Sequence, residues 1–316
     1  MAGYIVRRLL LMIPVLWGVS LIVFIAIRMV PGDVILAKME GEFSSKPEQI
    51  ARMRAELGLD VPGYVQYARW IGGVLQGDFG TSMNTFRPVL REIINRVPIT
   101  AELAILSLVF GTLIAVPIGV VSAVFQDTWL DYLGRLIAML ALSVPSFVIA
   151  TCLILFPSLW WGYFPPLGLA SFTERPLENL QQVIPATIAL GAILAGQITR
   201  LTRSSVLEVL RSDFVRTARA KGMADRWIIW RHVLKAALIP VVTLIGSDFG
   251  RLLGGTVVIE AIFAFPGMGL LTLTSIQLRD YTQLQGNVVF IAAVFVMFNL
   301  LVDLLYGVLD PRIRYS

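Results

Sequence analysis

The sequence predicts an all-α polytopic membrane protein with six transmembrane helices, from its composition, its apolar stretches and the distribution of its charges. Of the 316 residues, 57% are hydrophobic and 15% charged, whereas a soluble chain averages about 45–50% apolar and about 25% charged residues. Six mainly apolar stretches reach the roughly 20 residues that a spanning helix needs. These stretches are Leu9–Val30, Thr100–Phe125, Leu133–Trp160, Ile184–Leu201, Ala236–Ile262 and Val288–Leu309.

The first stretch follows Arg7 and Arg8 and is interpreted as a retained transmembrane helix. It is longer than the about 7–15 apolar residues of a signal peptide, and no small-residue cleavage site follows it.

Proline marks several of the later spans. Pro185 suits the first turn of the fourth span, where a missing N–H costs little. Pro117, Pro145 and Pro240 are expected inside spans, where neighbouring groups must satisfy the freed carbonyls. Asp310-Pro311 is expected to end the last span.

Lys and Arg concentrate in the loops on one side of the membrane, which predicts that both termini are cytoplasmic. The short external loops hold only Arg175 and Arg279, and the long segment 31–98 does not count because long loops translocate largely regardless of charge. The basic residues assigned to the cytoplasmic side are Arg7, Arg8, Arg135, Arg200, Arg203, Arg211, Arg216, Arg219, Lys221, Arg226, Arg231, Lys235, Arg312 and Arg314.

A small helical external domain is expected over residues 31–99, between the N-terminal span (1–30) and a five-helix core (100–316). One helix is predicted from near Pro47 to Gly58, a second over Tyr64–Gln76 and a third over Pro88–Val97. The domain is either a lid that packs on the spans or a docking surface for an external partner.

The most informative segment is the basic loop 203–235 between the fourth and fifth spans, in which Lys and Arg outnumber Asp and Glu. Apolar residues recur in it at helical spacing, which predicts cytoplasmic helices broken at Gly222. Its basic residues either only set topology and contact anionic lipid, or belong to a rigid surface helix that docks on a soluble partner. Nucleic-acid binding is disfavoured because the basic residues flank membrane helices.

This loop resembles the coupling loop of ABC importer permeases, and within them the dipeptide/oligopeptide/nickel branch. The family pattern is Glu-Ala-Ala, three residues, Gly, nine residues and then Ile-x-Leu-Pro. Gly222, at the end of the run Phe214–Gly222, and the nine residues between it and His232 fit this pattern. Arg216, Thr217 and Lys235 depart from that pattern, and their Arg-Thr-Ala-Arg-Ala-Lys-Gly form resembles the variant of the peptide branch.

The resemblance covers nearly the whole chain and points to the permease with the longer first external loop. The stretches that carry it, in order, are Tyr4–Leu9, Met29–Asp33, Leu57–Asp60, Gln66-Tyr67, Gly77–Gly80, Arg87–Val89, Glu260–Gly269, Arg279–Tyr281, Val302–Tyr306 and Asp310–Tyr315.

The resemblance implies an importer in the bacterial inner membrane with two permeases, two cytoplasmic ATPases and an external binding protein. This chain has no Walker-type phosphate loop, so ATP and Mg²⁺ are expected in the partner ATPases, and the chain itself is expected to be neither an enzyme nor a cofactor or metal protein. Closure of the ATPases would rotate the spans between inward-facing and outward-facing states. The residues expected to contact an ATPase are Arg216, Thr217, Ala218, Arg219, Ala220, Lys221, Gly222 and His232.

His232 and Cys152 are the only residues of their types. His232 is interpreted as a motif residue that hydrogen-bonds within the coupling loop, and a metal site built from histidines is excluded within the subunit. Cys152 excludes an intramolecular disulfide.

Polar residues within spans are candidates for the translocation path, because an ionisable group at mid-bilayer costs roughly 2.5–3.5 kcal/mol. Asp248 and Arg251 are either a self-neutralised packing pair or part of the path. The other candidates for path or gate are Ser143, Ser146, Asn299 and Asp303, and those for contact with the binding protein or sister subunit are Asp78, Phe79 and Glu260.

A secondary transporter is the main competing class. It would normally show internal repeats and membrane-embedded acidic sites, but no convincing repeat is found in this sequence, and the basic loop would have no use in such a transporter. A membrane enzyme is disfavoured because no nucleophile–base pair or metal cluster is visible. The resemblance favours di- or oligopeptides as substrate, with glutathione, nickel complexes and oligosaccharides as alternatives.

Overall fold

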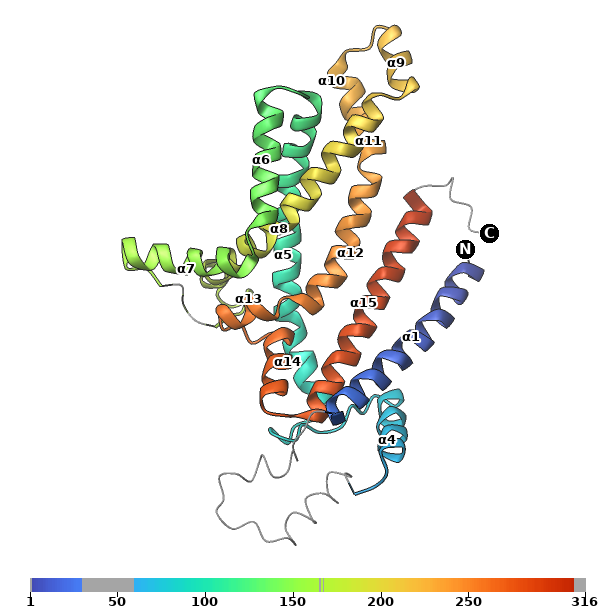
Figure 1. Ribbon diagram of the computed structural model, residues 1–316, viewed down its shortest axis with the longest axis vertical. Coiled ribbons are helices and arrows are strands. Elements are labelled where there is room, and N and C mark those ends of the chain that lie inside the picture. Colours follow the sequence, from blue (N-terminus) through green and yellow to red (C-terminus); the bar gives the residue numbers. More distant parts are fainter. Residues whose placement is uncertain (1, 30–59, 165, 167, 310–316) are drawn as a thin grey trace. The chain divides into compact units, whose positions relative to one another are not determined.

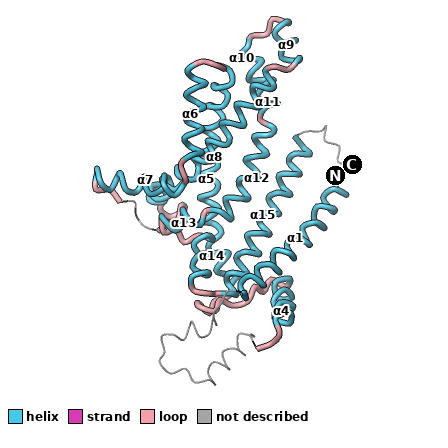
Figure 2. Tube along the Cα trace, in the orientation of Figure 1, coloured by secondary structure: helices cyan, strands magenta, loops and turns pink. Residues whose placement is uncertain are grey.

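The computed structural model describes residues 2–29, 60–164, 166 and 168–309, which form helices joined by short loops (Figures 1 and 2). The chain divides into two compact units. One comprises Met1–Pro98 with Leu270–Val294, and the other Ile99–Gly269 with Phe295–Ser316. Among the described residues the only β-structure is an isolated bridge between Thr81 and Pro88.

Five helices are long and apolar enough to cross a membrane, and α6 with α7 adds a sixth span if this bent pair is one. The all-α polytopic fold class is therefore confirmed. In chain order the helices are α1 Ala2–Met29, α4 Gly63–Leu75, α5 Val89–Val124, α6 Trp129–Ser143, α7 Ser146–Trp161, α8 Pro176–Leu210, α9 Asp213–Ala220, α10 Asp225–Ile228, the π-helical turn η1 Ile229–Val233, α11 Leu234–Ala237, α12 Ile239–Gly255, α13 Val257–Ile262, α14 Met268–Gln277 and α15 Tyr281–Leu309.

The third predicted span is not one straight helix. α6 and α7 are separated at Val144-Pro145 and bent by 94°. Proline cannot donate a backbone hydrogen bond and disfavours helical geometry in the residue before it. Val144 accordingly takes an extended conformation, with φ −94° and ψ 121°.

The fifth predicted span is also interrupted, because α12 ends at Gly255 and the short α13 follows it. Pro240 falls in the first turn of α12 and inside the span Asp225–Leu253, as predicted. By contrast, Pro176 stands at the start of α8, so that Pro185 lies within the helix and not in its first turn as predicted.

The predicted separate helix over Pro88–Val97 is wrong, because α5 runs without a break from Val89 through Pro98 to Val124. Val89 and Ile93 are fully buried on one side of this proline and Leu103 on the other. Packing on both sides offsets the one hydrogen bond that Pro98 removes.

Three other expectations concern the helices predicted between Pro47 and Gln76 and the end of the last span. The predicted helix over Tyr64–Gln76 is confirmed as α4. The helix expected from Pro47 to Gly58 and the Asp310-Pro311 stop lie outside the described residues.

In the first unit, α1 packs on α4 through the rings of Phe24, Tyr67 and Trp70. Arg28 lies over the Phe24 ring and donates to the side-chain oxygen of Gln66 at 2.7 Å. These contacts hold the short helix α4 against the end of α1.

Also in the first unit, Asp280 joins the loop before α5 to the start of α15. Its carboxylate accepts hydrogen bonds from the Ser82 hydroxyl and from the backbone N–H groups of Met83, Asn84 and Gln283. Asp280 is 3% exposed, and these donors satisfy its buried charge.

In the second unit, α8 lies beside α6 and α12 (Figure 1). One face of α8 is buried and packs against these neighbouring helices. A Cβ atom on Gly191 would lie 2.6 Å from a ring carbon of Phe110 and 3.0 Å from the Ser107 carbonyl of α5. Small residues allow this approach of two backbones, as they do between membrane helices in general. With 35 residues, α8 is about 50 Å long and exceeds the roughly 30 Å hydrocarbon core.

Candidate coupling site

The candidate coupling site is built on α9, which follows α8 after a two-residue turn. Its Val215 is fully buried and packs with Val206 of α8, Ile228 of α10 and Val233 of the π-helical turn. The other buried residues of this cluster are Ala123, Leu234 and Ala237. An apolar core therefore anchors α9 to the helices on either side of it in sequence.

A Schellman motif ends α9 at Gly222. The N–H of Met223 donates to the Ala218 carbonyl at 3.3 Å, and the N–H of Gly222 donates to the Arg219 carbonyl at 2.9 Å. Gly222 has φ +76°, which glycine adopts without a steric penalty. The predicted break at Gly222 is confirmed, and its cause is this left-handed turn.

The outer face of α9 is exposed but carries less free charge than the sequence indicated. Arg216 forms an ion pair with Asp213 at 3.3 Å, and the Arg219 Nε donates to the Asp225 carboxylate at 2.8 Å. Of the eight candidate coupling residues, seven are exposed and Ala218 is half-buried. The loop is also shorter than predicted, since residues 203–210 belong to α8.

His232 lies in the π-helical turn and is exposed. The side-chain hydrogen bond expected for it within the loop is not found among the residues that the structure describes. Exposure leaves its imidazole accessible to a partner.

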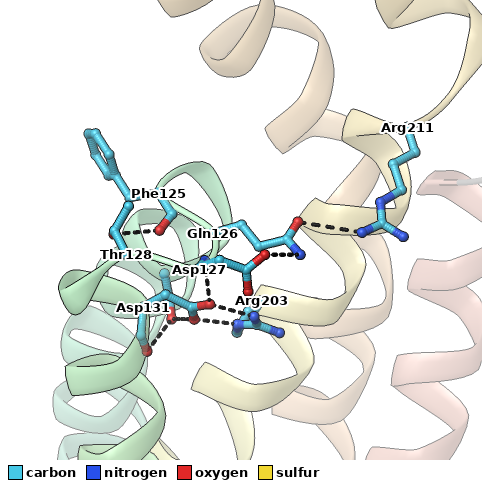
Figure 3. A network of polar contacts seen from close by, with 8 residues as sticks. Phe125, Gln126, Asp127, Thr128, Asp131, Arg203 and Arg211 are labelled. Carbon is cyan, nitrogen blue, oxygen red and sulfur yellow. Dashed lines mark hydrogen bonds and ion pairs between the residues drawn. The ribbon is translucent and has the colours of Figure 1, made fainter.

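An ion pair with a buried carboxylate, which the sequence did not predict, joins α6 and α8 (Figure 3). The Arg203 guanidinium of α8 donates from Nε and from Nη2 to the two carboxylate oxygens of Asp131 on α6, each at 2.7 Å. The Ser122 hydroxyl of α5 donates to the same carboxylate at 2.7 Å, and the Asp127 N–H donates at 3.1 Å. Asp131 is fully buried and the Arg203 side chain is 22% exposed.

The network continues along the turn between α5 and α6 (Figure 3). The Gln126 side-chain amide donates to Asp127 at 3.2 Å, and Arg211 donates to the Gln126 side-chain oxygen at 3.4 Å. Arg211 is the residue directly after α8. Polar contacts therefore join α5, α6 and the end of α8 at the point where the chain enters α9.

The candidate path residues Asp248 and Arg251 form the predicted ion pair, at 2.7 Å. Arg251 also donates to the Gln197 side-chain oxygen of α8 at 3.2 Å, and its side chain is 60% exposed. Asp248 is 2% exposed, and its second carboxylate oxygen has no hydrogen-bond partner among the described residues. The pair is therefore only partly satisfied within the described part of this chain.

Ser143 and Ser146 lie on the two sides of the break between α6 and α7. The Ser143 hydroxyl donates to the Met139 carbonyl at 2.8 Å, within its own helix. Asn299 and Asp303 are both half-buried on α15. These four residues thus belong to α6, α7 and α15, whereas the Asp248–Arg251 pair belongs to α12.

Glu260 of α13 is fully buried, so its carboxylate is engaged inside the chain. It accepts hydrogen bonds from the Thr100 and Thr256 hydroxyls, each at 2.7 Å. A Cβ on Gly267 would lie 2.5–2.6 Å from the Glu260 carboxylate atoms, so the loop after α13 closes directly over this group.

Asp78 and Phe79 line a surface hollow of about 300 Å³ in the first unit, together with Arg91 and Ile94 of α5. Asp78 is exposed and accepts a hydrogen bond from the Gly80 N–H at 2.8 Å. Phe79 is half-buried.

A set of candidate membrane-spanning helices, with a short anchored helix between two of them, defines a polytopic membrane protein. Two family models match the chain. The first, "binding-protein-dependent transport system inner membrane component", matches residues 115–315, and its N-terminal companion matches residues 1–104. The chain belongs to this family of ABC importer permeases. It is a multi-pass protein of the bacterial inner membrane and a transport subunit, not an enzyme.

Relatives at the sequence level match over their whole length. The chain is 40% identical over 316 residues, all of both chains, to the glutathione transport system permease protein GsiC of Salmonella typhimurium strain LT2. It is 39% identical, with the same coverage, to GsiC of Escherichia coli K12.

Solved structures share the fold at lower identity. An inward-facing MetNI methionine ABC transporter matches with a TM-score of 0.56 and 20% identity, covering 69% of this chain and 96% of that one. An amino acid ABC transporter crystallised with histidines matches with a TM-score of 0.52 and 15% identity, covering 71% of this chain and 94% of that one.

Proposed function

We propose that this permease provides the path for short peptides, and that glutathione, a tripeptide, is the first candidate among them. The observation that carries the proposal is the 40% identity over all of both chains to glutathione permeases. The peptide-branch form of the segment Arg216–Gly222 agrees with it. An external binding protein would select the substrate, and this chain would pair with a sister permease.

We further propose that α9 docks on one of two partner ATPases, with Arg216–Gly222 and His232 as its contact surface. The exposure of this surface and the burial of Val215 beneath it support the proposal. A rigidly seated helix can transmit a displacement to α8, because packed interfaces shift between discrete arrangements and do not deform continuously. ATP and Mg²⁺ would be held by the ATPases.

The substrate proposal is tested by uptake of labelled glutathione and a labelled dipeptide in cells that lack their own carriers. The chain is expressed with its cognate sister permease, ATPases and binding protein. We expect ATP-dependent glutathione uptake, with the unlabelled substrate of higher affinity blocking both labels. Uptake of nickel complexes or oligosaccharides without uptake of either peptide contradicts the substrate proposal, and uptake without the ATPases contradicts the importer mechanism.

The coupling proposal is tested by Gly222→Asp, with Gly222→Asn as the matched control. A Cβ at Gly222 meets nothing within 4 Å in this chain, and both Asn and Asp tolerate the left-handed conformation better than other residues. The variants should therefore insert normally. We expect Gly222→Asp to abolish uptake and Gly222→Asn to lose less, because the added charge faces the docked ATPase. Normal uptake by Gly222→Asp would contradict the proposal that α9 docks on an ATPase.

A further inference from the structure

We propose that a groove between α6 and α8 binds one anionic phospholipid, a site distinct from the coupling surface on α9. The groove has a volume of about 310 Å³, at the lower end of the range for small-molecule sites. Arg135, Arg200 and Arg203 line it together with the hydroxyl groups of Ser122, Thr199 and Ser204, and its apolar wall is Ala138, Met139 and Leu142.

The charge in the groove is positive and only partly neutralised. Arg203 is paired with Asp131. Arg135 and Arg200 are exposed, and no carboxylate of the described chain lies within ion-pair distance of either. Two guanidinium groups are therefore available for an anionic group, and arginine suits the oxygens of a phosphate.

The aromatic residues of α6 place the charged end of the groove at headgroup level. Trp129 is 70% exposed and Tyr132 is 58% exposed, and these side chains are enriched at membrane–water interfaces. Arg135 lies one turn further along α6, with its guanidinium 5.7 Å from the centre of the Tyr132 ring. The charged groups thus stand where a lipid phosphate would be.

The other end of the groove offers a surface for an acyl chain. Met139, which lines the groove, is 63% exposed and lies one turn beyond Arg135 along α6. A free phosphate would have no use for this apolar wall, whereas a phospholipid places its phosphate and its chain in this order. Basic pockets between membrane helices on the cytoplasmic side bind anionic lipid headgroups, and the predicted orientation puts these arginines there.

The test is the lipid retained by the purified complete transporter. The transporter is reconstituted in nanodiscs of phosphatidylcholine with a minor fraction of phosphatidylglycerol, extracted in mild detergent and analysed by native mass spectrometry. Arg135→Gln/Arg200→Gln is compared with Arg69→Gln/Arg175→Gln, which removes two exposed arginines elsewhere. We expect apparent phosphatidylglycerol affinity to fall about fivefold per arginine, about 25-fold in all, in the first variant only.

Two further variants separate the contribution of charge from that of the apolar wall. Arg135→Lys/Arg200→Lys keeps the charge and should keep most of the lipid. Met139→Trp keeps both arginines but fills the apolar wall, and it should also reduce retention. Unchanged retention in Arg135→Gln/Arg200→Gln overturns the proposal. So does equal competition by glycerol phosphate, which lacks acyl chains, or a photocrosslink from benzoylphenylalanine introduced in place of Met139 to the sister permease, which would mean that protein covers the groove.

Discussion

The ion pair between Asp131 and Arg203 yields the sharpest prediction about stability. Replacing Asp131 by Asn keeps the shape of the side chain but removes the carboxylate that the half-buried Arg203 guanidinium pairs with. Removing one partner of a buried ion pair costs about 3–5 kcal/mol. The Arg203 side chain is 22% exposed and regains some hydration, so we expect about 3 kcal/mol for Asp131→Asn.

The reverse substitution, Arg203→Gln, should cost more. It strands the carboxylate of Asp131, which is fully buried and keeps only the donors of Ser122 and Asp127. We expect about 4–5 kcal/mol, at the upper end of the same range. The double variant replaces both charges by neutral amides, which can hydrogen-bond to each other, so it should be less harmful than the sum of the two changes.

The measurement is the free energy of unfolding in mixed micelles of dodecylmaltoside and sodium dodecyl sulfate, for the two single variants and the double variant. A coupling free energy of about 2–3 kcal/mol is expected from this cycle, at the upper end for residues in direct contact. The exposed pair of Arg175 and Glu178 is the control, and Glu178→Gln should have little effect. Strictly additive changes at Asp131 and Arg203 would refute the reasoning.

Three other changes test single contacts. Gly191→Ala forces a Cβ to within 3.0 Å of the Ser107 carbonyl, so we expect a loss of about 1–3 kcal/mol in the same micelle titration, and none for Gly18→Ala, where the space is open. Gly267→Ala drives a methyl group into the Glu260 carboxylate and should reduce the amount of folded permease in the membrane, measured by fluorescence-detected gel filtration; an unchanged monodisperse peak speaks against it. Asp280→Ala leaves its hydrogen-bond donors without their acceptor and should make the loop at Ser82 sensitive to protease, whereas persistent protection would contradict the role of this carboxylate.

The transmembrane pattern was largely predictable because each helix buries its own backbone hydrogen bonds, which makes local hydrophobicity sufficient to find it. Breaks within spans were harder to predict. Val144-Pro145 ends α6, whereas Pro98 sits inside the continuous helix α5. The same residue type gave opposite results because Pro98 is held by packing on both sides, and sequence alone does not show that packing.

The coupling segment was predictable at the level of helices and turn, because Gly222 and the apolar residues around Val215 are local signals. Its charge was not. The basic residues of loop 203–235 appeared as one positive surface, yet Arg203 is half-buried and paired with Asp131, which lies 72 positions earlier in the chain. Asp131, the acidic residue in the first turn of α6, is visible in the sequence as a possible ion-pair partner. Only the fold shows that it pairs with Arg203.

The sequence by itself determined that this chain is a multi-pass membrane protein of the ABC importer permeases, since long apolar stretches and an ordered run of motif residues are properties of the chain. Tertiary structure alone decided which polar groups are engaged inside the chain. It buries Glu260, whose carboxylate accepts hydrogen bonds from two threonine hydroxyls, pairs Arg203 with Asp131, and leaves Arg135 and Arg200 exposed in the groove between α6 and α8. The physical reason is that a charge acts through its neighbours in space, and helices distant in sequence supply those neighbours.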